Sequence, residues 1–477
     1  MNEIRMPAVE PEEFELFEKL TQMEAFESAD FRKMNWSAIS SYGELMTSAC
    51  RRQLHNKAVV EELRAGDFDL AFTHHYDFCN FGLMRAANIS SYIWLSTAPF
   101  PEYMATITGL PTAASYVPNL FSSYSDRMTP LEKFLNILGI TFVHLFLQHT
   151  LLRPQTALFR EAYGAEFPSL SELAGRSELV MVNSDELLDF PRPIFHKTIY
   201  MGGLGLRNRA SPSKQSPLPK ELVAFLKSKA GGAVVISFGS VANTSHIPLH
   251  WLQAFTGAAE ARPDLAFLMK CDADSMRRLP ASLQRLPNFM SLSWLPQREL
   301  IASGKTTVLV YHGGWNTFLE ASFNAVPMLI IPLFGDQFVN ARRVERLGTG
   351  LSLDKMNVTR PTFLAAISQL LSNQSYKLEA QRLQRMLHKK PFSAEEVTLR
   401  WTRFIAEFGH VASLLPEAAF QSGMEYYLLD TFAAILLLLF GVLWIILKIL
   451  GLYWWWCCKI GKADHGVASI KVPYKQD

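Results

Sequence analysis

Short apolar runs alternate with longer amphipathic stretches through the middle of the chain, and Gly, Ser, Asn or Pro follows most of the short runs. This alternation is typical of strands and helices in a parallel α/β sheet. The expected strands are Phe68–Thr73, Tyr92–Ser96, Leu179–Asn183, Ala233–Phe238, Ala266–Met269, Thr307–Tyr311 and Met328–Ile331. We therefore expect an α/β fold that binds its ligand at the carboxyl ends of the strands.

The alternation breaks at residues 191–219, where Pro, Gly, Ser and basic residues cluster. This composition is typical of a linker and predicts a domain boundary. Residues 131–165 also differ, because they are strongly apolar but contain His144, Gln148 and His149. Two interpretations remain for this stretch, a helix at a membrane surface or a helix that lines an apolar pocket or core. We favour the pocket or core.

The strongest apolar run lies near the C-terminus. Residues 431–447 carry no charge, and Lys448 alone interrupts a further apolar run to Cys458. A helix needs about 20 apolar residues to cross hydrocarbon, and a lysine near the interface can snorkel. Tyr426 and Tyr427 precede the run and three tryptophans follow it, as expected at the two membrane interfaces. We predict a transmembrane helix here.

Basic residues set the expected orientation of that helix. Four lysines follow the span, Lys459, Lys462, Lys471 and Lys475. By the positive-inside rule the tail is cytosolic and the rest of the chain lumenal or extracellular. Five Asn-x-Ser/Thr triplets precede the span and permit glycosylation there, at Asn35, Asn88, Asn243, Asn357 and Asn373.

The start of the sequence disagrees with that orientation. Residues 1–20 are acidic and broken by prolines, whereas a signal peptide has a basic start and an apolar stretch. Taken literally, the chain is a tail-anchored protein that faces the cytosol. The alternative is that the true beginning of the protein lies upstream.

Composition narrows the classes of protein. Hydrophobic residues make up 49% of the 477 residues and charged residues 19%, which excludes a disordered chain. The formal net charge of +2 offers no general attraction for nucleic acid. The cysteines are Cys50, Cys79, Cys271, Cys457 and Cys458, and their spacing indicates neither a metal site nor a readable disulfide framework. Cys457 and Cys458 are either palmitoylation sites or small apolar residues at the membrane edge.

The most informative segment runs from residue 294 to residue 340. In it a buried strand, 306–311, leads into the turn His312-Gly313-Gly314 and then into a helix. Backbone N–H groups of such a turn and helix start bind phosphate, and His312 adds a donor that can be cationic. The segment does not contain a P-loop, because Glu299 occupies the position at which the P-loop motif requires its first glycine. The pattern therefore favours a diphosphate donor held by neutral groups over ATP hydrolysis.

These residues resemble the UDP-glycosyltransferases, and above all the membrane UDP-glucuronosyltransferases of animals. The resemblance covers roughly residues 45–460. It rests on Trp294-Leu295-Pro296-Gln297, His312 to Thr317, Glu320, Asp336-Gln337, Ser237 to Ser240, Val182 to Gly203 and Gly109 to Pro118. It implies the GT-B fold, in which two Rossmann-like domains face each other across a cleft.

On this basis we divide the chain into six parts. They are an incomplete acceptor domain (1–195), a linker (196–220), a UDP-sugar domain (221–395), helices that return to the first domain (396–427), a transmembrane helix (428–453) and a cytosolic tail (454–477). No permanently bound cofactor and no metal are expected, and the UDP-sugar is a co-substrate.

The resemblance also implies a role for individual residues. Trp294 would stack on uracil, Gln297 would contact the nucleoside, and Glu320 would accept the ribose hydroxyls. The diphosphate would bind at His312, Gly314, Asn316 and Thr317. Asp336 and Gln337 would bind hydroxyls of the donor sugar, and Ser240 would line the same cleft.

The family's general base, a histidine after the first strand of the acceptor domain, has no counterpart before residue 45. We therefore expect the sequence to lack that strand, that histidine and the signal peptide. Its acidic partner is expected where this chain has His74, while Asp77 lies in a different register. The weak candidates for a base are His74, His75 and Asp77.

Three functions follow from these observations. The leading one is an inverting transferase of the endoplasmic reticulum membrane, which moves glucuronic acid or glucose from a UDP-sugar to a small lipophilic hydroxyl compound. The second is a non-catalytic relative that binds UDP or pairs with active subunits, as a homo- or hetero-oligomer. The third is a cytosolic tail-anchored binding protein.

Overall fold

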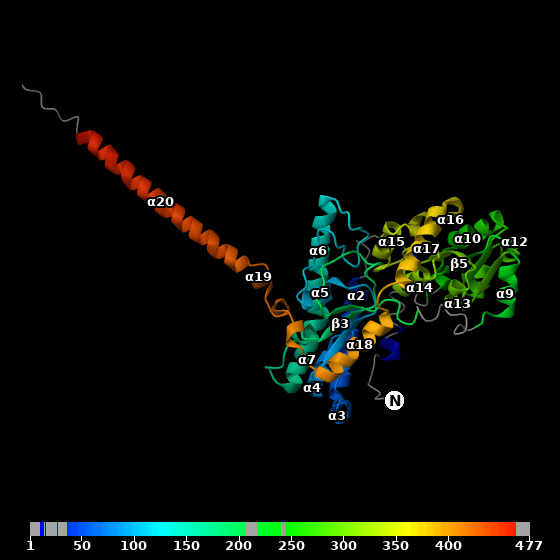
Figure 1. Cartoon of the computed structure of the whole chain (residues 1–477), viewed down its shortest axis with the longest axis horizontal. Helices are drawn as coiled ribbons and strands as arrows, with labels where there is room; N and C mark the ends of the chain where they lie inside the picture. Colours follow the sequence, from blue (N-terminus) through cyan, green and yellow to red (C-terminus); the bar gives the residue numbers. More distant parts are fainter. Residues whose placement is uncertain are drawn as a thin grey trace, which may run out of the picture. The chain divides into compact units, whose positions relative to one another are not determined.

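The computed structural model describes residues 10–13, 15, 26, 36–206, 217–239, 242 and 244–463. It divides into two compact units, residues 1–419 and residues 420–477. The first unit contains two parallel sheets, each covered by helices (Figure 1). The second contains the helices α19 (Gly423–Tyr426) and α20 (Leu429–Ala463).

The first sheet has the strand order β1-β2-β3-β4 and is parallel throughout. Its strands are β1 (Ala71–His74), β2 (Tyr92–Ser96), β3 (Leu179–Val182) and β4 (Thr198–Tyr200). Its helices are α2 (Trp36–His55), α3 (Lys57–Ala65), α4 (Cys79–Ala86), α5 (Glu102–Ile107), α6 (Pro130–Leu147), the π-helix η2 (Gln148–Leu152), α7 (Arg153–Tyr163) and α8 (Leu170–Gly175).

The second sheet has the order β10-β9-β8-β5-β6-β7, the arrangement of a Rossmann fold. Its strands are β5 (Ala233–Ser237), β6 (Ala266–Lys270), β7 (Phe289–Leu292), β8 (Thr306–Tyr311), β9 (Met328–Ile330) and β10 (Gly350–Ser352). Around it lie α9 (Lys220–Lys227), η5 (Thr244–His246), α10 (Leu249–Ala261), α11 (Ala273–Arg277), α12 (Ala281–Gln284), α13 (Gln297–Ala302), α14 (Trp315–Phe323), α15 (Gln337–Arg346), η6 (Lys355–Asn357), α16 (Arg360–Ser372) and α17 (Gln374–His388).

The central strands of this sheet bury both faces. Val234 and Ile236 of β5 pack into one apolar cluster, which includes side chains of α10 and α16. Ala233 and Val235 of the same strand pack into a second cluster on the other face, with side chains of α14. A strand that is covered on both faces has no polar position, which explains the continuous apolar runs in the sequence.

The segment 196–220, which we expected to be a linker, contains β4. This strand pairs with β3, so Thr198–Tyr200 belongs to the first sheet and not to a linker. Beyond the second sheet, α18 (Ala394–Phe408) returns to the first sheet, where Ile405 packs with Ile93 and Leu179. The short helices η7 (Ala412–Leu414) and η8 (Glu417–Ala419) end the first unit.

The strand β1 lies at the edge of the first sheet. It pairs with β2, and no other described strand lies on its second side. Phe68 and Phe72, before and within β1, are about half exposed, at 47% and 48%. Among the described residues, this edge of the sheet therefore has no strand partner and carries exposed apolar side chains.

A disulfide joins Cys50 of α2 to Cys79 of α4. The cysteine spacing did not reveal this pair, because a disulfide across 29 residues depends on how two helices pack. The bond fixes α2 against the helix that follows β1. Among the described cysteines, Cys271 is free and buried, and Cys457 and Cys458 are free and exposed.

The expectation of a core segment at residues 131–165 is confirmed only in its second part, where Leu151, Leu152, Leu158 and Phe159 pack in the core. The first part, helix α6, is not a core helix. Within it only Asn136 and Ile140 are buried. The side chain of Asn136 anchors the buried face of α6 through hydrogen bonds. Its Oδ1 accepts from the backbone N–H of Asn119, and its NH₂ group donates to the carbonyl oxygens of Ala114 and Val117. Large apolar side chains are exposed along the rest of the helix, namely Leu131, Phe134, Leu135, Ile137, Leu138, Phe142 and Leu145.

Two described helical segments are long and apolar enough to cross a membrane, residues 130–163 and residues 429–459. The second has the higher mean hydropathy, 2.8 against 1.5. It lies within α20, which is one continuous helix of 35 residues (Figure 1). Its length and composition fit the predicted transmembrane helix.

Candidate functional site

The candidate site lies where the strand order of the second sheet reverses. β5 and β8 are neighbours, and the chain proceeds from them toward opposite edges of the sheet. Ser237, the last residue of β5, is in register with Tyr311, the last residue of β8. The loop after β5 and the turn His312-Gly313-Gly314 therefore start side by side. Ligands of open α/β sheets bind at this position.

Two glycines make room for the imidazole of His312. A Cβ atom at Gly239, whose φ is +82°, would lie 2.8 Å from Cε1 of His312. A Cβ atom at Gly314 would lie 2.5 Å from Nε2 of the same ring. Both loops can thus approach each other only with glycine at these positions. Ser240, which we predicted to line the cleft, lies outside the described residues.

Burial, together with a smaller effect of the nearby Lys270 ammonium, lowers the pKa of His312 to about 4. Burial therefore favours the neutral form of the ring near pH 7, rather than the cationic form that the sequence alone allows. A neutral imidazole still donates one N–H to an anion.

The helix α14 starts directly after the turn. Its N-cap is Gly314, so no side chain of the N-cap residue occupies the backbone N–H groups of the first turn. Asn316 and Thr317 lie in that first turn, as the sequence predicts. Free N–H groups and the helix dipole together favour a phosphate at this point.

Gln297, Thr317 and Glu320 form one hydrogen-bonded group between α13 and α14. Nε2 of Gln297 donates to Oγ1 of Thr317 and to Oε2 of Glu320, both at 3.1 Å. The guanidinium of Arg298 donates to the other carboxylate oxygen of Glu320, at 2.7 Å. Glu320 is buried while Arg298 is exposed, so the structure orients the carboxylate that we expect to bind ribose hydroxyls.

Asp336 and Gln337 lie at the start of α15. Oε1 of Gln337 accepts from the backbone N–H groups of Leu333 and Phe334, which leaves its NH₂ group as the free end. The amide of Asn340 donates to Oδ2 of Asp336 and to the carbonyl oxygen of Gly313, each at 2.9 Å. Asn340 thereby connects the expected sugar-binding carboxylate to the phosphate turn. Burial raises the pKa of Asp336.

Trp294 has 72% of its surface exposed, which excludes a role in core packing. The ammonium group of Lys270 lies 5.2 Å from the centre of its ring and donates to the carbonyl oxygen of Gly239, at 2.6 Å. An exposed indole beside a cation and a glycine loop is suited to stack on a nucleobase.

The three candidate bases lie at the carboxyl end of β1. Asp77 accepts from Nε2 of Gln155 at 2.6 Å, and burial raises its pKa. His75 is buried, and burial lowers its pKa to about 4. His74 is exposed, and its Nδ1 accepts from the backbone N–H of Tyr76 at 3.2 Å. Of the three, His74 is the one that solvent can reach readily.

A family model described as UDP-glucoronosyl and UDP-glucosyl transferase matches residues 3–464. The chain belongs to this family. It is 30% identical over 435 residues to the putative UDP-glucuronosyltransferase ugt-60 of Caenorhabditis elegans, with 89% of this chain and 82% of that protein covered. It is also 30% identical to UDP-glucuronosyltransferase 3A1 of Bos taurus, with 87% and 77% covered.

Solved structures agree with the family's fold. A UDP complex of Os79 from O. sativa superposes with a TM-score of 0.53 at 17% identity, over 77% of this chain and 84% of that one. A UDP complex of UDP-glucose: anthocyanidin 3-O-glucosyltransferase superposes with a TM-score of 0.54 at 16% identity, over 80% and 84%. The predicted GT-B fold is confirmed.

For this UDP-glycosyltransferase, sequence analysis missed several polar residues of the site. Arg298, Asn340 and Lys270 each contact a predicted residue or its loop. The sequence contained a signal for Lys270, because this polar residue ends the buried strand β6 at the edge where the other site residues gather. In the described part of the chain, no group of three or more His, Cys, Asp or Glu side chains could hold a metal ion.

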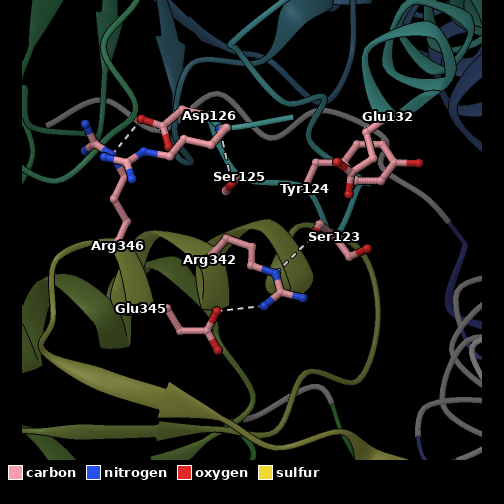
Figure 2. A pocket seen from close by; sticks show the side chains of 9 residues that line it. Ser123, Tyr124, Ser125, Asp126, Glu132, Arg342, Glu345 and Arg346 are labelled. Atoms are coloured by element: carbon pink, nitrogen blue, oxygen red, sulfur yellow. Dashed lines mark hydrogen bonds and ion pairs between the residues drawn. The ribbon is translucent and has the colours of Figure 1, made fainter. Parts of the chain in front are cut away.

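We call the part of the chain around the first sheet the first half, and the part around the second sheet the second half. A separate polar cavity of about 400 Å³ is lined by residues of both halves. Figure 2 shows Arg342, Glu345 and Arg346 of α15 opposite the loop that contains Ser123 and Asp126. Arg346 pairs with Asp126 at 2.7 Å, and Arg342 donates to the carbonyl oxygen of Ser123 at 2.9 Å. The helix that begins with the expected sugar-binding residues thus also contacts the first half. None of the predicted site residues lines this cavity.

Proposed function

We propose that this UDP-glycosyltransferase moves glucuronic acid or glucose from a UDP-sugar to a hydroxyl group of a small lipophilic compound, with inversion at the anomeric carbon. One observation supports the donor half of this proposal above all others. Nine of the ten predicted donor residues lie in three described segments, each of which follows a strand of the second sheet: the segment after β7, the turn and helix after β8, and the start of α15 after β9.

In this proposal each part of the donor has its own contacts. Uracil stacks on the exposed ring of Trp294, and the ribose hydroxyls donate to Glu320. The diphosphate binds the turn at His312 and Gly314 and the first turn of α14. The hydroxyl groups of the sugar bind Asp336 and the free NH₂ group of Gln337.

The reaction itself needs a base and a stabilised leaving group. The acceptor oxygen attacks the anomeric carbon, the bond from that carbon to the diphosphate breaks, and the bonding electrons leave with UDP. The base takes the acceptor's proton. The N–H of neutral His312, the α14 N-terminus and the nearby Lys270 would stabilise the charge that develops on the diphosphate.

A second candidate function, UDP binding with little or no turnover, is supported by the state of the three candidate bases. The carboxylate of Asp77 already accepts a hydrogen bond from Gln155, and His75 is buried with a low pKa. His74 is exposed, but the group at its Nδ1 is a backbone N–H rather than a carboxylate. A carboxylate there would raise its proton affinity, and general-base help is typically worth about 10²–10⁴-fold.

Two measurements test these functions, one on the purified chain and one on membranes from cells that express this chain alone. Calorimetry on the purified chain should show UDP binding, and a well-folded protein that binds no UDP would sink the donor proposal. Turnover of UDP-glucuronic acid or UDP-glucose should be low against a panel of phenols and steroids. Robust turnover that His74→Ala abolishes would identify His74 as the base and exclude the second function.

We further propose that the enzyme resides in the endoplasmic reticulum membrane, with residues 1–427 lumenal and the tail after residue 453 cytosolic. The disulfide Cys50–Cys79 supports this orientation, because disulfides persist in oxidising compartments. The glycosylation triplets at Asn88, Asn357 and Asn373 are exposed. A chain that is insensitive to endoglycosidase and whose Cys50 and Cys79 are reduced would instead face the cytosol.

A further inference from the structure

Asn183 links the first half of the molecule to the phosphate turn of the second. It directly follows β3, and its backbone N–H donates to Ser96 at the end of β2. Its backbone carbonyl accepts from the indole N–H of Trp315, the first residue of α14. Its side chain reaches Asn316, the next residue of that helix. Asn183 is therefore the point at which two strands of the first sheet contact the N-terminus of α14.

The hydrogen bonds of the Asn183 amide have a fixed direction. Its NH₂ group lies 3.0 Å from the carbonyl oxygen of Thr97 and 3.0 Å from Oδ1 of Asn316. A backbone carbonyl can only accept, so the group of Asn183 that faces Thr97 must be the donor. The two hydrogens of that NH₂ group match the two acceptors.

The direction of these hydrogen bonds also fixes the orientation of the Asn316 amide. Because Asn183 donates to Oδ1 of Asn316, the amide of Asn316 is held with its oxygen toward the first half. Its own NH₂ group is then the free end, and no described residue accepts a hydrogen bond from it. An Asn316 amide in the opposite orientation would present a carbonyl oxygen to the phosphate, which repels an anion.

We propose that Asn183 is a positioning residue, which holds the amide of Asn316 in the orientation that donates to the diphosphate of the UDP-sugar. The proposal rests on the proposed donor site, and it adds that the first half of the molecule determines the polarity of that site. Asn183 itself does not contact the ligand.

A comparison of UDP with uridine tests the proposal on the full-length chain in detergent micelles. Asn183→Ala should weaken UDP binding about tenfold or more, the usual effect of losing one hydrogen bond to a charged group. It should leave uridine binding unchanged, because uridine has no phosphate. Equal losses for UDP and uridine would mean a general disturbance of the site and would overturn the proposal.

A double-mutant cycle with Asn316→Ala tests whether Asn183 acts through Asn316. The proposal expects Asn183→Ala to have no further effect on UDP affinity when Asn316 is already alanine. Additive losses would overturn it. Asn183→Asp is a second variant that keeps the shape of the side chain. It should weaken UDP binding more in the native background than in the Asn316→Ala background, where the added charge acts alone.

UDP binding by the unaltered chain is the reference that distinguishes failure of the donor-site proposal from failure of the Asn183 proposal. If that chain binds UDP and Asn183→Ala binds UDP equally well, the role of Asn183 fails and the donor site stands. If unaltered, folded chain binds no UDP, the donor site fails and the role of Asn183 fails with it. Thermal unfolding of each variant shows whether the first half has kept its fold.

Discussion

At the residue scale, local motifs predict the centre of the site better than its surroundings. His312, Gly314, Asn316 and Thr317 are neighbours in the sequence, so one turn at the end of a strand places them together. Asn183, Lys270 and Asn340 come from separate elements. The contacts of Asn183 with α14 depend on how the two sheets pack, and no local pattern in the sequence carries that information.

Truncation of the exposed indole tests the proposed uracil contact. Trp294→Ala should weaken UDP binding by about 1–3 kcal/mol, because one aromatic stacking contact is lost. Calorimetry at a fixed salt concentration measures it. Phe392→Ala removes an aromatic side chain that is also exposed, at 57%, and is not among the predicted site residues, so it should bind UDP as well as unaltered chain. A Trp294→Ala variant with full affinity would exclude stacking on this ring.

The buried histidines predict a pH dependence of stability. Burial lowers the pKa of His75 and of His312 to about 4, below the usual value of about 6.5. Between these values the unfolded chain takes up protons that the folded chain does not, so stability should fall as pH decreases from 6.5 to 4. Chemical denaturation at several pH values measures the slope, and His75→Gln should reduce it. UDP affinity should not reflect titration of His312 between pH 6 and 8.

At the scale of elements, all seven expected strands occur, although β1 begins three residues later than Phe68. The three that sequence analysis missed are β4, β7 and β10. β4 and β10 have only three residues each, too few for a pattern of burial to emerge. β7 lies at the sheet edge and is only partly buried, so its sequence lacks the continuous apolar run of a central strand.

The cross-link between α2 and α4 should stabilise the first half. A disulfide that closes a loop of about 30 residues contributes roughly 3–4 kcal/mol in the chain-entropy description. Cys50→Ser with Cys79→Ser should therefore lower the unfolding midpoint in non-reducing buffer. The same double variant is also the control, because a reducing agent should destabilise unaltered chain and leave the variant unaffected. Equal midpoints in all four measurements would contradict a structural role for the bond.

At the scale of the whole molecule, family resemblance supplied the GT-B fold, and the strand order of the second sheet agrees with it. The apolar surface of α6 shows where a hydropathy pattern fails. The sequence of that helix is apolar enough for a core, but the asparagine that it buries reverses the usual distribution of polar and apolar faces.

The C-terminal helix should behave as an integral membrane segment. We expect the chain to stay in the pellet after alkaline carbonate extraction of membranes, because residues 429–459 are apolar over more than the length needed to cross hydrocarbon. Replacing Leu438 and Leu443 by arginine should release a fraction of the protein, since each buried charge disfavours insertion. Release of unaltered chain into the supernatant would contradict the prediction.

The open edge of β1 has a consequence for handling the protein in solution. An edge strand with exposed phenylalanines before it and within it is a template on which a second chain can add a strand, so association should increase with protein concentration. Light scattering on micelle-solubilised chain should show a mass that rises on concentration and falls on dilution. Phe72→Lys should suppress that rise, because a charge on an edge strand disfavours pairing, whereas Phe392→Lys should not.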